Sequence, residues 1–358
     1  MDPFAELPYI TSNIPGIGGR IRETPEDFIV EEIPAYDPIG TGEHLFINLT
    51  RSGMNTRYLM DKITSLFELK RDDVSYAGLK DRHAIATQTF SIFFGYNKPT
   101  VEDVIEIVSS SLPVTVNWAK YHSKKIRSGH LRGNKFIIGV NKLEVPINEA
   151  FERTTKILAA LREKGLPNYY GPQRIGIEGN NMNRGHDIIK GKLRLRDRWL
   201  NRFLISSYID HLFNVYIAER IEKGFYDKLL LGDIAKKAST GGLFVVESLE
   251  DEQTRYDLHE INFTAPIYGP KMWFAEKDSE VFERRILEEA EITLDELKKV
   301  KVRGSRRVGR LNPEIKVEKT DKGLRFEFSL PKGSYATTVL REIMKPSSSR
   351  IFEPPKKE

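Results

Sequence analysis

The sequence predicts a protein that mixes α-helices with β-strands, and two patterns support this prediction. Segments in which polar and apolar residues alternate are typical of strands. They occur at residues 28–33, 44–50, 87–93, 315–317 and 324–330. Residues 55–66 and 147–164 instead carry apolar side chains at helical spacing, and Gly165 follows the second of these helices, where a helix commonly ends. A chain of 358 residues is long enough for two compact domains.

Composition narrows the class of protein. Lysine and arginine outnumber aspartate and glutamate by 56 to 51, and the net charge of +5 favours a polyanionic partner. The chain has no cysteine, which excludes disulfides, thiolate metal ligands and a cysteine nucleophile. No uncharged apolar run approaches the roughly 20 residues of a membrane helix. Residues 1–6 carry acids and a proline where a signal peptide carries cations, so we expect a cytoplasmic protein without a membrane partner.

The stretch at 76–84 brings together the groups best suited to chemistry. Asp81 lies between Lys80 and Arg82, and Gly78 ahead of it leaves the backbone uncrowded. The strand predicted at 87–93 follows, so Asp81 should lie on a loop at the edge or end of a sheet. On spacing alone, a solvated turn in which the two cations screen Asp81 explains the run equally well.

Two basic stretches without acids point to RNA. The first, at 118–136, interleaves cations with Trp118, Tyr121, His122 and His130, which suits phosphates and stacked bases. A solvated hairpin is the alternative, and the two histidines lack metal-ligand spacing. The second stretch, at 298–310, is less specific. The cations we expect to contact RNA are Lys124, Lys125, Arg127, Arg132, Arg306 and Arg307.

Residues 167–176 are rich in glycine, proline and asparagine around Tyr169 and Tyr170, which predicts a rigid loop with exposed rings. From about residue 188 to 311 the chain becomes more basic and breaks into short strands and turns around two predicted helices. Near the end, Gly333 and Ser334 precede a helical apolar run and form a plausible helix start.

Three motifs in the same order resemble those of the TruD family of pseudouridine synthases. They are Gly-Leu-Lys-Asp-Arg-His-Ala at 78–84, Asn-Tyr-Tyr-Gly-Pro-Gln-Arg-Ile-Gly at 168–176, and the segment that begins at Gly333. A basic residue ahead of Pro-Glu-Asp-Phe marks a further family position, which here is Arg22. The second motif departs from the family pattern, because Tyr170 and Ile175 stand where phenylalanine is common.

The resemblance implies a mixed α/β fold: a pseudouridine synthase core with a largely antiparallel sheet. It implies a discontinuous catalytic domain at 1–187 and 312–358, interrupted by an inserted α/β TRUD domain at 188–311 that faces RNA. It further implies that uridine 13 of tRNA is isomerised to pseudouridine, with other RNAs as further candidate substrates. No cofactor or metal is expected, because the reaction exchanges one glycosidic bond for another without redox change. The lack of an evident apolar patch favours a monomer.

The resemblance also assigns roles. Asp81 would be the nucleophile, and Lys80 and Arg82 would favour its charged form. Arg22 would hold the ribose-phosphate or neutralise charge near Asp81. Tyr170 would stack on a uracil flipped out of the RNA, and Asn168 would read the base or anchor its loop.

Two other functions fit parts of the sequence. An RNA-binding module without chemistry would need only the basic stretches, and Asp81→Asn would then change nothing. A metal-dependent nuclease would need carboxylates near Asp81, for which Asp72 and Asp73 are the candidates. Its activity would be lost with a chelator.

Overall fold

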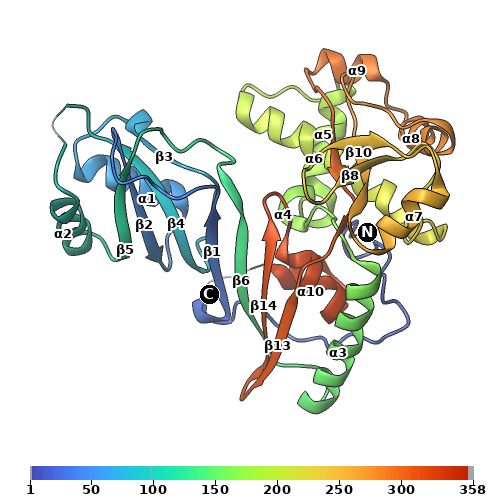
Figure 1. Cartoon of the computed structure of the whole chain (residues 1–358), viewed down its shortest axis with the longest axis horizontal. Helices are drawn as coiled ribbons and strands as arrows, with labels where there is room; N and C mark the ends of the chain where they lie inside the picture. Colours follow the sequence, from blue (N-terminus) through green and yellow to red (C-terminus); the bar gives the residue numbers. More distant parts are fainter. Residues whose placement is uncertain (1, 97, 354–358) are drawn as a thin grey trace. The chain divides into compact units, whose positions relative to one another are not determined.

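The structure is a computed structural model that describes residues 2–96 and 98–353 (Figure 1). It contains two compact units, each built from separate parts of the chain. Within the described residues, the first unit comprises 2–18, 152–313 and 334–353, and the second comprises 19–96, 98–151 and 314–333. The catalytic domain expected at 1–187 and 312–358, with an insertion at 188–311, remains a prediction. No helix among the described residues is long and apolar enough to cross a membrane.

An eight-stranded sheet forms the second unit. Seven strands lie in the order β13-β14-β6-β1-β4-β2-β5, and the short β3 pairs with β4. Their bounds are β1 Phe28–Pro34, β2 His44–Arg51, β3 Val74–Tyr76, β4 Ile85–Phe93, β5 Thr115–His122, β6 Leu131–Asn141, β13 Ile315–Thr320 and β14 Gly323–Pro331. Only the β1–β4 pair among these ladders is parallel. The expected mixed fold with a largely antiparallel sheet is therefore confirmed.

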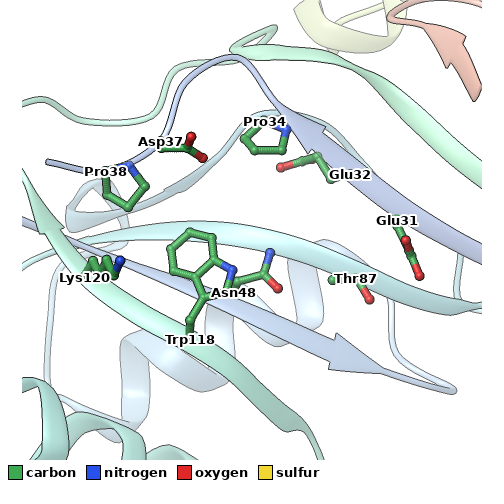
Figure 2. A pocket seen from close by; sticks show the side chains of 9 residues that line it. All are labelled: Glu31, Glu32, Pro34, Asp37, Pro38, Asn48, Thr87, Trp118 and Lys120. Atoms are coloured by element: carbon green, nitrogen blue, oxygen red, sulfur yellow. The ribbon is translucent and has the colours of Figure 1, made fainter. Parts of the chain in front are cut away.

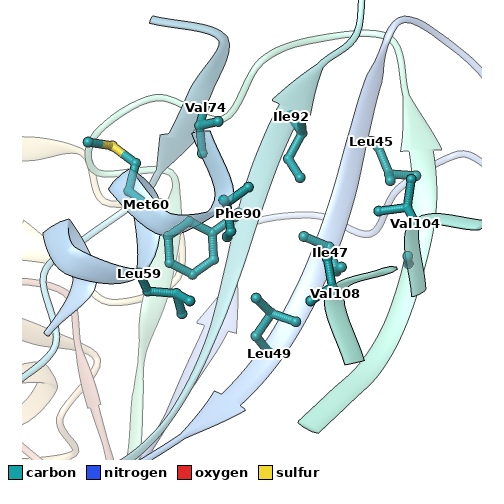
Figure 3. Close-up of a cluster of buried hydrophobic side chains, with 12 residues drawn as sticks. Leu45, Ile47, Leu49, Leu59, Met60, Val74, Phe90, Ile92, Val104 and Val108 are labelled. Carbon is teal, nitrogen blue, oxygen red and sulfur yellow. The ribbon is translucent and has the colours of Figure 1, made fainter. Parts of the chain in front are cut away.

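Two helices, α1 (Thr56–Leu66) and α2 (Val101–Ser111), pack on one face of this sheet. Alternate residues of β2 and β4 form the core beneath them, including Leu45, Ile47 and Phe90 (Figure 3). Helix α1 begins as predicted, because the Asn55 side chain accepts a hydrogen bond from the Tyr58 backbone N–H. The periodic apolar positions thus place the helix and the sheet against each other.

One expectation about this sheet was wrong. Residues 88–92 are all buried rather than half-buried, since β4 is an inner strand flanked by β1 and β2. The hairpin that we considered as an alternative for residues 118–136 does not form. Strand β5 pairs with β2, whereas β6 lies between β1 and β14.

The first unit combines helices with two small antiparallel sheets. Strands β11 (Ser305–Val308), β10 (Ile261–Ile267), β8 (Ile234–Lys237) and β9 (Leu243–Val245) form one sheet in that order, and β12 (Arg310–Leu311) pairs with β7 (Leu166–Pro167). The helices are α3 Ile147–Lys164, whose residues from 152 belong to this unit, α4 Pro172–Ile175, α5 Asn180–Ile189, α6 Arg198–Glu222, α7 Leu249–Asp257, α8 Lys277–Glu289, α9 Leu294–Lys299 and α10 Ala336–Met344. The predicted helix at 147–164 is confirmed at both ends.

Helix α10 holds the start of the chain. The buried Arg341 guanidinium donates to the backbone carbonyls of Phe4, at 3.0 Å, and of Leu7. The neighbouring Glu342 carboxylate accepts the Thr11 hydroxyl at 2.8 Å. These bonds satisfy the backbone of an N-terminal segment that has no sheet or helix of its own. The helix begins at Ala336, with Tyr335 rather than Ser334 as its N-cap residue.

Candidate active site

Asp81 lies on the loop between β3 and β4, where its carboxylate meets a buried arginine. The distance from Arg22 Nη2 to Asp81 Oδ2 is 2.9 Å. The Arg22 side chain is 5% exposed, whereas that of Asp81 is 57% exposed. Burial lowers the pKa of Arg22, and the nearby Asp81 charge acts in the opposite direction. The guanidinium also lies 4.1 Å from the centre of the Phe28 ring. The result is a reachable carboxylate beside a cation fixed by its surroundings.

Lys80 anchors this loop instead of pairing with Asp81. Its Nζ lies 2.9 Å from Glu32 Oε2, and both side chains are almost completely buried. Its backbone N–H donates to Thr56 Oγ1 at 2.8 Å. We expected Lys80 and Arg82 to support the charge of Asp81. In the structure Arg22 makes that contact, and Arg82 Nε donates to the Gly53 carbonyl at 3.0 Å.

A buried polar network holds the start of the same loop, at Gly78. Gln88 Nε2 donates to the Gly78 carbonyl, and Gln88 Oε1 accepts from Arg51 at 3.1 Å and from the Thr56 hydroxyl at 3.0 Å. Burial lowers the pKa of Arg51 to about 10. Sequence reasoning missed Glu32, Arg51 and Gln88. For Glu32 and Gln88 the signal was a polar residue within a predicted strand, at a position that the structure buries, and Arg51 directly follows the strand predicted at 44–50.

Asn134 is a further residue that the sequence analysis did not single out. It lies opposite Glu32 in the β1–β6 ladder, so both side chains leave the same face of the sheet. Its buried Oδ1 has no hydrogen-bond partner among the described residues. Two residues on, Phe136 packs edge-to-face on Phe28, the ring beneath Arg22. The sequence cannot show that a buried acceptor such as this oxygen has no hydrogen-bond donor among the described residues.

The second motif lies in the first unit, where Asn168 is an anchor. Its Nδ2 donates to the Val308 carbonyl at 2.8 Å, and its Oδ1 accepts from Arg307 Nη2 at 2.6 Å and from Ser334 Oγ at 3.1 Å. Of the two roles we considered, reading the base and anchoring the loop, these bonds support the second. They also join the second and third motifs.

Tyr170 is held from several sides. Its backbone N–H and carbonyl bind the Asn214 side chain at 2.8 and 3.0 Å, and Arg307 lies 4.1 Å from its ring centre. Burial raises the pKa of the Tyr170 hydroxyl well above its usual value. The expectation of two exposed rings was wrong, because Tyr169 is 2% exposed and Tyr170 is partly buried.

The predicted RNA-contacting cations divide into two groups. Lys124, Arg127 and Arg132 are exposed or partly exposed, and Lys125 donates to the Asp72 carbonyl. Arg306 is different, since its side chain is 2% exposed and its guanidinium binds Glu283 at 2.6 Å. Arg307 binds Asn168 within the same unit. These contacts make the 305–308 segment a structural element, which corrects our expectation that Arg306 faces RNA.

The carboxylates that a nuclease would need serve local roles. Asp73 Oδ2 accepts the Lys70 backbone N–H at 3.0 Å, and Asp72 is exposed in the same turn. In the part of the chain that the structure describes, no three His, Asp or Glu side chains gather in a way that could hold a metal ion.

Comparison of the fold with solved structures indicates the class of protein. It matches the crystal structure of a putative tRNA pseudouridine synthase D (TruD) from Methanosarcina mazei with a TM-score of 0.78, covering 96% of this chain and 97% of that one at 23% identity. This likeness places the chain among proteins with the pseudouridine synthase fold. The family model of tRNA pseudouridine synthase D (TruD) matches residues 5–196 and 192–343. The chain belongs to the TruD family.

Curated relatives match the sequence of this chain over nearly its whole length. A tRNA pseudouridine synthase D of Thermus thermophilus is 40% identical over 339 residues, which cover 94% of this chain and 92% of that protein. The protein of the same name from Anaeromyxobacter sp. (strain Fw109-5) is 36% identical over 350 residues, covering 96% and 97%.

Proposed function

We propose that the protein isomerises uridine to pseudouridine in tRNA, at position 13, with Asp81 as the nucleophile. The observation that carries the proposal is the contact between the exposed Asp81 carboxylate and the buried Arg22 guanidinium at 2.9 Å. Family membership supports the reaction, and the location of this contact on the first family motif supports the residue.

The geometry suits nucleophilic catalysis by a carboxylate. Arg22 stabilises the ionised form of Asp81, which is the form that attacks. Lys80 and Gln88 hold the loop just before Asp81, and Arg82 binds the Gly53 carbonyl just after it, so little reorganisation accompanies the attack. The isomerisation breaks the bond between uracil N1 and the ribose C1′ and forms one between C5 and C1′. The hydrogen on C5 is released as a proton, N1 takes up a proton in its place, and no electrons are gained or lost.

The target base must leave the RNA stack before its C5 can reach the sugar. We assign Tyr170 as the ring on which the flipped uracil stacks, with Arg307 fixing its orientation. Asn168 positions this loop without touching the base. The exposed cations Lys124 and Arg127 neutralise phosphates of the tRNA. The enzyme works in the cytoplasm as a monomer.

Release of tritium from tRNA labelled at uridine C5 tests the reaction directly. Wild-type protein should release tritium with and without a chelator, and Asp81→Asn should abolish release while tRNA binding and folding are kept. Asp72→Asn is the matched control and should leave release unchanged. Tight tRNA binding without release by wild type would favour the RNA-binding module. Cleavage of the tRNA without tritium release, lost with chelator or in Asp72→Asn, would favour the nuclease.

A further inference from the structure

The second unit contains a pocket of about 470 Å³ that the proposed reaction does not use. Glu31, Glu32, Pro34, Asp37, Pro38, Asn48, Thr87, Trp118 and Lys120 line it (Figure 2). Neither Arg22 nor Asp81 belongs to this lining. Thr87 and Asn48 alternate with the residues that pack under α1 and α2, so the pocket opens on the opposite face of the sheet. A volume of this size is typical of small-ligand sites.

The roof of the pocket is the segment after β1, and three contacts hold it in place. Arg132 Nε donates to the Ala35 carbonyl at 3.2 Å. The Tyr36 ring stacks on His122 with 5.1 Å between ring centres. The Gly40 backbone N–H donates to the Tyr121 carbonyl at 2.9 Å. The pocket is therefore formed before any ligand arrives, which lowers the entropic cost of binding.

Some polar side chains that line the pocket already have partners within the protein, and others do not form ion pairs. Glu32 is paired with Lys80, and the Asn48 amide bonds Thr89 at 3.0 Å. Asp37 and Lys120 form no ion pair with any residue that the structure describes. Figure 2 shows the Trp118 ring and the Asp37 carboxylate on opposite sides of the pocket. A flat apolar surface thus faces a hydrogen-bond acceptor, with a cation beside them.

We infer that this pocket binds an unpaired guanine of the tRNA, a different nucleotide from the uridine that reacts. An indole offers a stacking surface to any base. Guanine in addition presents two adjacent N–H donors, at N1 and N2, that one carboxylate can accept together, whereas uracil presents a single N–H between two carbonyl oxygens. Lys120 supplies the positive charge for the phosphate of this nucleotide. The exposed Lys124 and Arg127 follow Lys120 in the protein sequence. The inference rests on the proposed function, because it takes tRNA as the substrate.

Tryptophan fluorescence can report on this pocket alone. The chain has three tryptophans, and Trp199 and Trp273 are 53% and 46% exposed. The double variant Trp199→Phe/Trp273→Phe therefore leaves Trp118 as the single probe. We expect GMP to quench it in a saturable way, with an affinity at least about tenfold higher than that of UMP. Asp37→Asn in the same background should remove this preference, since the amide no longer accepts both N–H groups.

A second measurement connects the pocket to tRNA. Asp37→Asn in the otherwise unchanged chain should raise KM for tritium release about tenfold and leave kcat unchanged. Asp61→Asn, an exposed aspartate of the same unit, is the matched control and should change neither. Trp118→Leu should raise KM likewise, and circular dichroism will show that it folds.

Three results would overturn the inference: no quenching by any nucleotide in folded protein, equal quenching by GMP and UMP, or strong quenching by spermidine with none by GMP. The last would mark a site for a polyamine. The nucleotide titration needs no turnover, so it stays informative if the proposed reaction fails.

Discussion

The buried pair of Lys80 and Glu32 allows a quantitative test of how the loop at Asp81 is held. Their side chains are 4% and 2% exposed, and their charged atoms are 2.9 Å apart. Lys80→Met keeps most of the length of the side chain but leaves the Glu32 carboxylate buried without its partner. Removing one member of such a pair costs about 3–5 kcal/mol, because the remaining charge is neither solvated nor compensated.

The double variant Lys80→Met/Glu32→Leu removes both charges and should regain most of this loss, since an apolar pair of similar volume is often neutral. Urea denaturation followed by circular dichroism measures both variants. Arg82→Met is the matched control: it lies on the other side of Asp81 at an exposed position and should cost less than about 1 kcal/mol. A loss below about 1 kcal/mol for Lys80→Met, or a double variant as unstable as the single one, would refute the reasoning.

Three further predictions follow from contacts described above. Arg22→Met removes a charged hydrogen bond to Asp81 and should lower kcat for tritium release by about 10- to 100-fold without unfolding the protein; an unchanged kcat would contradict a catalytic use of the pair. Lys124→Ala should reduce the salt dependence of tRNA binding by about one unit of slope in a log–log plot, whereas Arg306→Met should leave the slope unchanged and destabilise the fold. Burial lowers the pKa of His211 to about 4, so the unfolded chain binds the extra proton first. Stability should therefore fall on the order of 2 kcal/mol between about pH 6.5 and pH 4, and His211→Asn should flatten that dependence in urea titrations.

Local patterns predicted several elements closely. The strands at 28–33 and 44–50 and the helices at 56–66 and 147–164 agree with the structure to within one residue. Each depends on the period of its own apolar residues and, for α1, on a capping side chain at Asn55. The apolar period and the helix cap involve residues that are close in sequence, and so the sequence alone can predict them.

The site was harder to predict because its contacts join distant positions. Arg22 and Asp81 are 59 residues apart, and Lys80 and Glu32 are 48 apart. The resemblance placed Arg22 near the active site, but neither pattern nor resemblance showed that Lys80 turns inward to Glu32. Arg306 illustrates the same limit. A cation in a basic stretch looks solvated until the strand order brings Glu283 to it.

The connectivity of both units has a consequence for synthesis on the ribosome. Strand β14 pairs with β6 along its full length, and α10 binds residues 4–11, yet both are encoded near the end of the chain. Until residues 323–344 have emerged, the nascent chain exposes β6 as an open edge and leaves the carbonyls of its first residues without their arginine partner. We expect the full-length chain to fold late, and a product that stops short of residue 323 to be a target for chaperones and proteases.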